Sequence, residues 1–465
     1  MSSHNLEADY LIVGSGAVGM AFADTLLSET DASLIIVDRY AKPGGHWNMA
    51  YPFVTLHQPS AFYGVSSKEL AKGSKDEVGL NKGLHDLATG DEVSAYFEEV
   101  MRHRFLPSGR VQYFPMCEYQ SDGNFVSKLS GKQYHASAHK KTVDCTFLNT
   151  SVPATHTPSF EIEEGVRFMP LNDLVNVTEP PAGYVIIGGG KTGIDACLWL
   201  LENGVDPDTI EWIMPRDAWL LDRANTQPSD EFFAQTMGAQ AAQVESIAQA
   251  DSVDDMFDRL ESSGYFVRID TSVRPQMFHG ATISQLELQA LRQIKNVIRL
   301  GRVTHLGSKE IVFEQGRRPT SPQHLHIDCS ASAITNLESK PVFAGELITP
   351  QTVRSYQPVF SAAFIAHVEA TYDNEVEKNA LCNVVPLPNT TDDYLRLTAA
   401  FMMNQYQWSQ NKEIRAWLLD NRLDGFSKIV ANIQQHETDK LAIMKRLRDN
   451  SMPAMAKLQE FLAAL

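Results

Sequence analysis

The sequence has 465 residues, enough for two or three domains with substantial buried cores. Hydrophobic residues make up 43% and charged residues 21%, which excludes both a largely disordered chain and a coiled-coil rod. The net charge of -17 argues against nucleic acid as a partner, because a polyanion gains little from approaching so acidic a surface.

The first organised segment predicts a strand, a glycine turn, a helix and a second strand. Residues 8–13 form a short apolar run that is typical of a buried parallel strand, and a second apolar run, residues 33–37, ends at Asp38. Between them lies a Gly-x-Gly-x-x-Gly turn at residues 14–19, followed by small and apolar residues that predict a helix. This order of elements predicts a dinucleotide-binding unit.

Each special residue of this unit has a physical role. Gly14 permits the tight turn, Gly16 lets a pyrophosphate approach the backbone, and Gly19 lets the helix pack closely on the strand. Asp38 is expected to accept hydrogen bonds from an adenosine ribose. A purely structural glycine turn is the alternative, and the combination of strand, helix and acid disfavours it.

A stretch rich in turn-forming and aromatic residues follows, and it is poor material for a helix or a strand. Its glycine pair leaves the backbone bare, so Gly45, His46 and Trp47 could line a flat flavin ring. A surface turn around a buried tryptophan is the alternative. His57 is a candidate hydrogen-bond donor to the flavin face, although a packed histidine explains it equally well. Trp47, His46 and His57 are therefore the candidate catalytic residues.

A second fingerprint lies in the middle of the chain. The apolar run 184–187 predicts a strand that leads into a turn containing Gly188, Gly190 and Gly193. The next predicted strand ends not at an acid but at Arg216, whose guanidinium suits the 2′-phosphate of NADPH. NADPH is therefore favoured over NADH, with a surface ion pair between Arg216 and the adjacent aspartate as the alternative.

Caps and periodicity predict the remaining elements. Capping boxes at Ser252 and Ser284 indicate helices inserted into the second unit. The expected strands are 297–300, 303–306 and 311–313, and the expected C-terminal helices are 394–407, 413–419 and 441–465, the last interrupted near Pro453. The run 324–331 resembles a last strand whose small residues approach the first nucleotide. Its two histidines alternate without clustered ligands, so we expect no metal site there.

These motifs together resemble a known family. Two fingerprints, an acid after the first, an arginine after the second and a Gly-Gly-x-Trp turn between them are similar to the flavin-containing monooxygenase group over most of residues 8–335. The resemblance implies that FAD is held by Gly14, Gly16, Gly19 and Asp38, that the flavin ring lies near Gly45, His46 and Trp47, and that NADPH is held by Gly188, Gly190, Gly193 and Arg216. The chain lacks the Phe-x-Gly-x-x-x-His signature that usually precedes the second fingerprint, which makes it a divergent member.

The resemblance also implies an activity and a domain plan. The activity is that of a monooxygenase that consumes NADPH and inserts one oxygen atom from O2 into a small organic substrate through a flavin hydroperoxide. The expected fold is α/β, with two Rossmann-like dinucleotide-binding domains and a helical C-terminal region. We expect the first part of the FAD-binding domain at residues 1–175, the NADPH-binding domain with a helical insertion at residues 176–320, and a return to the FAD domain plus C-terminal helices at residues 321–465.

Cysteine usage and the chain ends bear on the compartment and on the alternatives. The five cysteines are widely spaced and include no Cys-x-x-Cys pair, which fits a reducing compartment and gives no support to a redox disulfide. No secretory leader and no apolar run of about 18 residues occur, so we expect a cytoplasmic protein that does not contact a membrane. An NADPH-dependent FAD reductase or dehydrogenase and a non-enzymatic flavin redox sensor stay open as alternatives, and a homodimer is compatible with the sequence.

Overall fold

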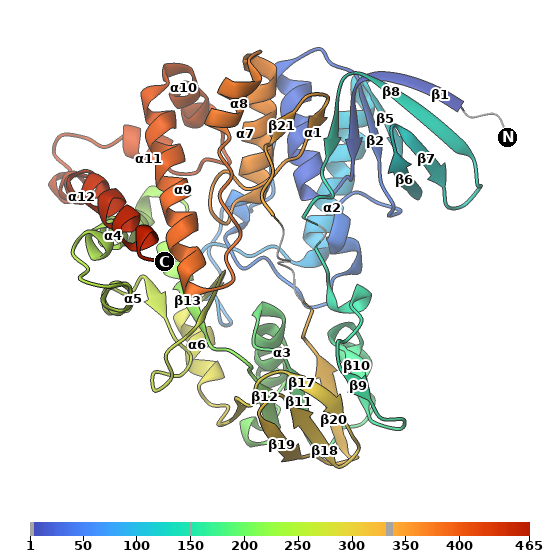
Figure 1. Cartoon of the computed structure of the whole chain (residues 1–465), viewed down its shortest axis with the longest axis vertical. Helices are drawn as coiled ribbons and strands as arrows, with labels where there is room; N and C mark the ends of the chain where they lie inside the picture. The colour runs from blue at the N-terminus through green and yellow to red at the C-terminus, as the bar shows by residue number, and fades with distance from the viewer. Residues whose placement is uncertain (1–3, 149, 332–337) are drawn as a thin grey trace.

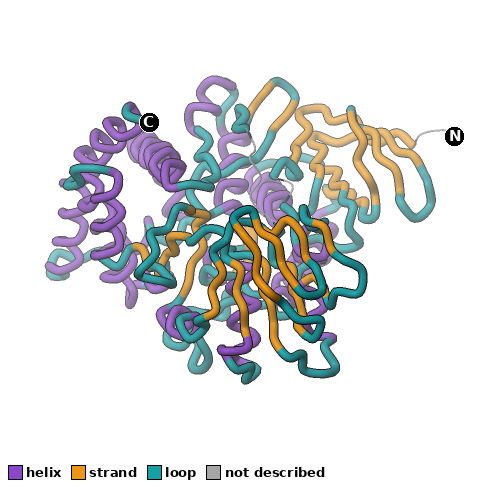
Figure 2. Tube along the Cα trace, turned by 60° about the horizontal axis from the view of Figure 1, so that its bottom comes forward, coloured by secondary structure: helices purple, strands orange, loops and turns teal. Residues whose placement is uncertain are grey.

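Two sheets, one mixed and one parallel, each with a glycine turn after a central strand, organise the part of the chain that the structure describes, residues 4–148, 150–331 and 338–465. In the computed structural model the first sheet lies at the upper right of Figure 1, the second at the bottom and the C-terminal helices at the upper left. Figure 2 shows the same division, with many helices gathered on the side that carries the C-terminus. The predicted α/β class, with two Rossmann-like units and a helical C-terminal region, is confirmed.

The first sheet has the strand order β21-β22-β8-β1-β2-β5, with the hairpin of β6 and β7 attached to β8. Its strands are β1 (His4–Val13), β2 (Leu34–Val37), β5 (Val111–Phe114), β6 (Cys117–Ser121), β7 (Asn124–Ser127), β8 (Gln133–Asp144), β21 (Phe343–Ala344) and β22 (Leu347–Ile348). β1 pairs in parallel with β2 and β8, and β22 brings the C-terminal part of the chain back to β8. Neighbouring residues of β1 face opposite ways, so Ile12 and Leu11 enter separate cores on the two faces of the sheet.

Three helices contribute to the core on one face of this sheet. α1 (Ala17–Glu29) begins at the glycine turn and packs on α7 (Pro358–Thr371), whose residues are buried on every side. A helix that is apolar all round belongs inside a core. The C-terminal half of the chain therefore supplies part of the first unit. α2 (Gly90–Val100), which starts with a capping box at Thr89, adds Phe97 to the same core.

The second sheet is parallel throughout, with the order β10-β20-β11-β12-β16. Its strands are β10 (Phe168–Pro170), β11 (Gly183–Ile187), β12 (Ile210–Ile213), β16 (Asn296–Ile298) and β20 (His324–Asp328). α3 (Lys191–Glu202) follows its glycine turn as α1 follows the first. The expectation that residues 324–331 approach the first nucleotide is wrong, because β20 pairs with β11 and the next residue, Cys329, lies against Gly188. The second sheet therefore extends past residue 320.

Inserted elements form two smaller sheets and three helices. The elements that follow β12 are β13 (Ala218–Asp222), α4 (Phe233–Ala248), α5 (Val253–Ser262), β14 (Phe266–Val267), β15 (Met277–Ile283) and α6 (Gln285–Leu291). The predicted capping box forms at Ser284 on α6, whereas Ser252 caps α5 with its side chain alone. The short strands elsewhere are β3 (Gly64–Val65), β4 (Lys68–Glu69), β9 (Glu161–Ile162), β17 (Val303–Leu306), β18 (Glu310–Phe313) and β19 (Gly316–Pro319). β9, β17, β18 and β19 form one sheet, which packs on the second sheet.

The C-terminal helices pack partly on the inserted region and partly on the core of the first unit. They are α8 (Glu375–Leu381), α9 (Thr391–Gln410), α10 (Lys412–Asp420), α11 (Ser427–Ala431) and α12 (Thr438–Ala463). The interruption expected near Pro453 is wrong, because α12 continues through it. Proline removes one backbone hydrogen bond, but Ala454 and Leu458 are buried just beyond it, so packing outweighs that loss. α12 lies along α4 (Figure 1), which joins the end of the chain to the inserted region.

Candidate functional site

The first glycine turn, between β1 and α1, is packed tightly. Gly14 has a φ of 97°, a left-handed conformation that favours glycine, and its N–H donates to the Val37 carbonyl oxygen at 2.8 Å. A Cβ on Gly19 would collide with the Gly14 carbonyl oxygen. The close approach of α1 to β1 therefore requires glycine at both positions.

The glycine pair before Trp47 lies directly against this turn. The Gly44 N–H donates to the Ser15 carbonyl oxygen at 2.8 Å, and a Cβ on Gly45 would lie 2.9 Å from Gly16 Cα. The two backbones are in contact here, with no side chain between them. Folding thus brings Gly16 and Gly45 together although they lie far apart in the sequence.

Asp38 directly follows β2 beside this turn and is only 4% exposed. Its carboxylate accepts hydrogen bonds from the Ser15 N–H, from the Ser15 hydroxyl at 2.7 Å, and from the Tyr40 N–H at 2.7 Å. A carboxylate offers about four acceptor positions, so these three bonds leave about one for a ligand. Asp38 therefore holds the glycine turn in shape in addition to any contact with a ribose.

His46 and Trp47 lie in a 3-10 helix, Gly45–Met49, that starts at the glycine pair. Trp47 Nε1 donates to the Tyr63 hydroxyl at 2.8 Å, and the His46 and Trp47 rings stack with centroids 5.3 Å apart. Burial lowers the pKa of His46 to about 4, so its ring is neutral at pH 7. Because the Trp47 donor is already bonded within the protein, this residue has only its ring faces to offer a ligand.

The second glycine turn, between β11 and α3, has the same tight packing but a more open front. A Cβ on Gly193 would collide with the Gly188 carbonyl oxygen, which also accepts a hydrogen bond from Trp212 Nε1 at 2.8 Å. Gly190 occupies the position that Gly16 has in the first turn, and no atom lies within 4 Å of the place where its Cβ would be. The start of α3 is therefore accessible.

Both turns leave the first N–H groups of their helices without a side-chain cap. Gly16 and Gly190 are the N-cap residues of α1 and α3, and neither helix has an acidic residue in its first turn. A side-chain cap begins α2, α5, α6, α8, α9 and α10. The described helices α4, α7, α11 and α12 also lack such a cap, but their N-cap residues are not glycines. Unbonded N–H groups and the helix dipole make both starts suitable for an anion such as a pyrophosphate.

Arg216 follows β12 near the second turn. Its Nη2 donates to Asn389 Oδ1 at 3.0 Å, and an ion pair with Asp217 does not form, because Asp217 binds Arg299 through two hydrogen bonds of 2.8 and 3.0 Å. Burial lowers the pKa of Arg216, and the nearby charge of Arg302 lowers it further. Within the described residues, neither Arg216 nor Arg302 forms an ion pair. The second turn therefore has two uncompensated cations near it.

His57 lies where the first unit meets β15. Its carbonyl oxygen accepts hydrogen bonds from Arg223 Nε at 3.0 Å and from the Thr282 hydroxyl. Burial lowers the pKa of His57 to about 3, and the charges of Lys191 and Arg223 contribute to the shift. Arg223 is itself fully buried and pairs with Glu287 at 2.8 Å. Since Lys191 is the first residue of α3, His57 lies close to the second turn.

Direct contacts join the segment after the 3-10 helix to α3. The Tyr51 hydroxyl donates to Asp195 Oδ2 at 2.6 Å, and the same carboxylate pairs with Lys191. Burial raises the pKa of Tyr51 well above its usual range. Phe53 stacks on Trp199 with ring centroids 4.7 Å apart. These contacts bring the regions of the two glycine turns together.

Arg223, Tyr51 and Asn389 also lie near these sites and are not among the predicted site residues. Nothing in their local sequence distinguishes them, because each reaches its partner only through folding. Lys191 is different, because its position alone indicates a negatively charged partner. A positive charge in the first turn of a helix is unfavourable unless an anion accompanies it. In the structure Asp195, one turn later, supplies that negative charge.

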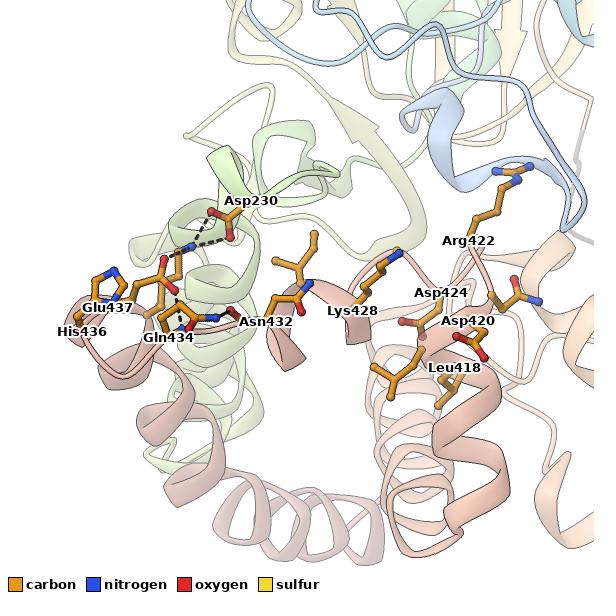
Figure 3. Close-up of a pocket in the computed structure, with 15 residues that line it drawn as sticks. Asp230, Leu418, Asp420, Arg422, Asp424, Lys428, Asn432, Gln434, His436 and Glu437 are labelled. Atoms are coloured by element: carbon orange, nitrogen blue, oxygen red, sulfur yellow. Dashed lines mark hydrogen bonds and ion pairs between the residues drawn. The ribbon is translucent and has the colours of Figure 1, made fainter.

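A cavity of about 600 Å³ lies elsewhere, between α10, α11 and the start of α12 (Figure 3). Several of its charged side chains are paired internally: Lys440 with Asp230 at 2.5 Å, and Asp424 with Arg354 at 2.7 Å. Apart from Asp230, its lining comes entirely from residues 418–440. None of the predicted site residues lines this cavity, so we do not assign it to either turn.

Other predicted features can be placed as well. Within the described ranges, no group of three or more His, Cys, Asp or Glu side chains is placed to hold a metal ion. The His326 ring is within hydrogen-bonding distance of the Arg167 carbonyl oxygen, at 3.1 Å, and of Thr320 Oγ1, at 2.9 Å, so both its nitrogens have partners. All five cysteines are free thiols. No described helix combines the length and the apolar composition needed to cross a membrane.

No family model matches the chain. Proteins of Mycobacterium bovis and Mycobacterium tuberculosis, each described as uncharacterized, are 45% identical to it over 419 residues, which is 90% of this chain and 78% of each relative.

The solved structures that align with the chain include a flavin-containing monooxygenase from Stenotrophomonas maltophilia, with 12% identity and a TM-score of 0.43 over 81% of this chain and 99% of that one. They also include the open form of a cyclohexanone monooxygenase, with 12% identity and a TM-score of 0.48 over 96% of this chain and 98% of that one. The two Rossmann-like units described above rest on the strands of this chain itself.

Proposed function

The chain belongs to one family with the uncharacterized mycobacterial proteins, and from its own two glycine turns we propose that it is an FAD-dependent, NADPH-consuming monooxygenase of small organic substrates. One observation carries this proposal. Two helices start at glycine N-caps with unbonded N–H groups, each directly after a strand that has a parallel neighbour on both sides. Two such starts in one chain suit two dinucleotides.

The backbone of the first glycine turn and the carboxylate of Asp38 suit FAD. The start of α1 would face the pyrophosphate, and the remaining acceptor position of Asp38 would bind a ribose hydroxyl. When bound, FAD would accept hydride from NADPH and then let O2 react with the reduced ring. The chain's contribution here is to hold the cofactor with preformed groups, since Ser15, Asp38 and the Gly16–Gly45 contact are already in place.

NADPH fits the second turn by its open helix start and its cations. The pyrophosphate would lie at Gly190, where no protein atom occupies the space beside the glycine. Arg216 would bind the 2′-phosphate, with Arg302 contributing a second positive charge. The chain has a net charge of -17 and should repel anions over most of its surface. Two neighbouring arginines without acidic partners in the described part of the chain therefore offer an anion a favourable place on it.

The candidate catalytic residues would act by covering and orienting rather than by transferring protons. With pKa values of about 4 and 3, His46 and His57 carry no charge at pH 7, so each can donate one hydrogen bond and accept another. Trp47 would exclude water with its ring face, since its N–H is bonded to Tyr63. A dry, neutral surround of this kind suits an oxygen transfer in which the cofactor does the chemistry.

FAD content tests the first half of the proposal. The purified protein should carry bound FAD, and Gly16→Val should lose it, because a side chain would enter the space between the turn and the pyrophosphate. Gly190→Val is the matched variant and should keep FAD while losing affinity for NADP+. Wild-type FAD content in Gly16→Val would reject this turn as the FAD site.

Coupling of NADPH use to oxygenation tests the second half. With a substrate found by screening small organic compounds under isotopically labelled O2, the product should contain one labelled oxygen atom. Trp47→Ala should then release more hydrogen peroxide per NADPH consumed than the wild type, and Tyr63→Phe, which keeps both rings, should release less than Trp47→Ala. Product without the label would favour the reductase alternative.

A further inference from the structure

One asparagine from the C-terminal region reaches the second nucleotide turn. Asn389 lies in the loop before α9, and its Oδ1 accepts a hydrogen bond from Arg216 Nη2 at 3.0 Å. The same oxygen lies 2.9 Å from Nε2 of His279, a residue of β15. An amide oxygen can only accept, so His279 must carry its proton on Nε2. Three separate parts of the chain thus meet at one oxygen atom.

The loop that presents Asn389 is held by its backbone and not by this side chain. The N–H groups of Asn389 and Thr390 donate to Asp393 at 3.0 and 2.9 Å, within the capping box that begins α9. The loop also forms an antiparallel bridge between Thr390 and Met277 of β15. The position of the Asn389 side chain is therefore set independently of what it binds, and changing it should leave the loop in place.

The chemistry of the asparagine suits a cation that must remain charged. A carboxylate in its place would fix the guanidinium equally well but would also neutralise it. An amide fixes one N–H of the fork and leaves the positive charge and the other four N–H groups available. Burial also lowers the pKa of His279, with the Arg216 charge contributing, so the histidine adds a neutral donor and no repulsion at pH 7.

We propose that Asn389 and His279 are positioning residues that hold the Arg216 guanidinium for the 2′-phosphate of NADPH, so that the C-terminal region helps to set the choice between NADPH and NADH. This inference rests on the proposed function, because it takes the second turn as the NADPH site. It adds that the selectivity for the 2′-phosphate depends on a residue outside the Rossmann-like unit.

Equilibrium binding of NADP+ and NAD+ tests the proposal without relying on turnover. The two nucleotides differ only in the 2′-phosphate, and calorimetric dissociation constants of the purified protein give their ratio directly. Arg216→Ala should weaken NADP+ binding by about tenfold to a hundredfold and leave NAD+ nearly unchanged. Asn389→Ala should weaken NADP+ alone by about threefold to tenfold, since the guanidinium keeps its charge but loses its orientation.

Two further variants separate positioning from general damage. Asn389→Asp should reduce NADP+ binding more than Asn389→Ala does, because it neutralises Arg216, and it should again spare NAD+. Asn432→Ala, the same change at an exposed asparagine of the C-terminal region, should alter neither constant. Wild-type urea unfolding midpoints for the Asn389 variants would show that the loop and the fold are intact.

The outcomes distinguish this inference from the proposed function. A wild type without preference for NADP+ overturns the proposed use of NADPH and the inference with it. A wild-type preference that is lost in Arg216→Ala but kept in both Asn389 variants overturns the inference alone. Equal weakening of NADP+ and NAD+ in the Asn389 variants also overturns it, because the side chain would then support the site as a whole and not the 2′-phosphate contact.

Discussion

The two glycine turns of this chain share a backbone plan but differ in how much of their surroundings is already in place. At the first turn the Gly45 backbone touches Gly16, and Asp38 is buried and bonded to Ser15. At the second turn Gly190 faces open space and Arg216 has no carboxylate partner among the residues that the structure describes. The first turn is therefore a closed, preformed site and the second an open, cationic one.

This difference matches two kinds of cofactor use. A closed site with most of its hydrogen bonds formed suits a nucleotide that stays bound through many cycles, as FAD does in a flavoenzyme. An open site with unpaired positive charge suits a nucleotide that must enter and leave on every cycle, because charge attraction speeds association without burying the ligand. The comparison therefore predicts which substitutions affect the fold and which affect only binding.

Glycine substitutions should have the largest effects on the free energy of unfolding. They should also distinguish the tightly packed glycine positions from the open one. Gly19→Ala and Gly193→Ala should each lower the free energy of unfolding by about 3 kcal/mol or more, since the new methyl group meets a carbonyl oxygen. Gly190→Ala should lower it by less than about 1 kcal/mol, because nothing surrounds that position. Urea unfolding of the three variants measures this, and equal losses at Gly190 and Gly193 would contradict the open second turn.

Arg216→Ala should affect only the second turn. The Michaelis constant for NADPH should rise about tenfold to a hundredfold, with little change for NADH and none in FAD content. Arg302→Ala should give a smaller rise in the same direction, because Arg302 is exposed to solvent. Steady-state kinetics with both nucleotides measures the contrast. Parallel changes for NADPH and NADH would remove the arginines from phosphate recognition.

His57 should make the region between the turns less stable in acid. Burial holds the pKa of His57 at about 3, whereas a histidine in an unfolded chain has a pKa of about 6.5. As the pH falls below about 6.5 the unfolded state binds the proton first, so stability is lost between pH 7 and 5 by about 2 kcal/mol from this residue. His57→Asn should reduce the pH dependence of the unfolding free energy by that amount.

A control at another histidine sharpens this result. His103→Asn changes an exposed side chain and should leave the pH dependence as it is in the wild type. The expected order is a shallower profile for His57→Asn and an unchanged profile for His103→Asn, both from urea unfolding at pH 7 and pH 5. If the two variants shifted the profile equally, the neutral, buried state of His57 would be refuted.

Tyr51→Phe should have a modest effect, confined to the contact between the two turns. Removing the hydroxyl costs Asp195 one hydrogen bond while its pairing with Lys191 remains, so unfolding should become easier by about 1.5 kcal/mol. Tyr406→Phe is the matched control, since Tyr406 is 55% exposed. Indistinguishable unfolding free energies for the two variants would mean that the Tyr51 hydroxyl does not join the regions.

The sequence predicted those parts of the molecule whose signals are local. Each glycine turn follows an apolar strand directly, and the caps at Ser252 and Ser284 depend on residues three positions away, so all of them can be identified from short segments. The fold class followed from the order of these segments. β20 was expected beside the first unit because the sequence of an apolar strand does not indicate its neighbour, and only its pairing with β11 places it in the second sheet.

The candidate site was predictable only in part for the same reason. The residues of the glycine motifs can be identified from their spacing, but Asn389 and Arg223 reach the sites from segments far away in the sequence. At Pro453 a local rule gave a wrong prediction: proline was expected to interrupt the helix, but the packing of Ala454 and Leu458 keeps it continuous. Local rules identify turns and caps, whereas tertiary contacts decide what reaches them.

The most direct test of the account is anaerobic mixing of the purified protein with NADPH while the flavin absorbance is recorded. The account predicts that the protein contains FAD as isolated, that NADPH reduces this flavin in a single enzyme preparation without added cofactor, and that NADH does so far more slowly. A protein without flavin, or with flavin that NADPH leaves oxidised, would contradict the assignment of the two glycine turns to FAD and NADPH.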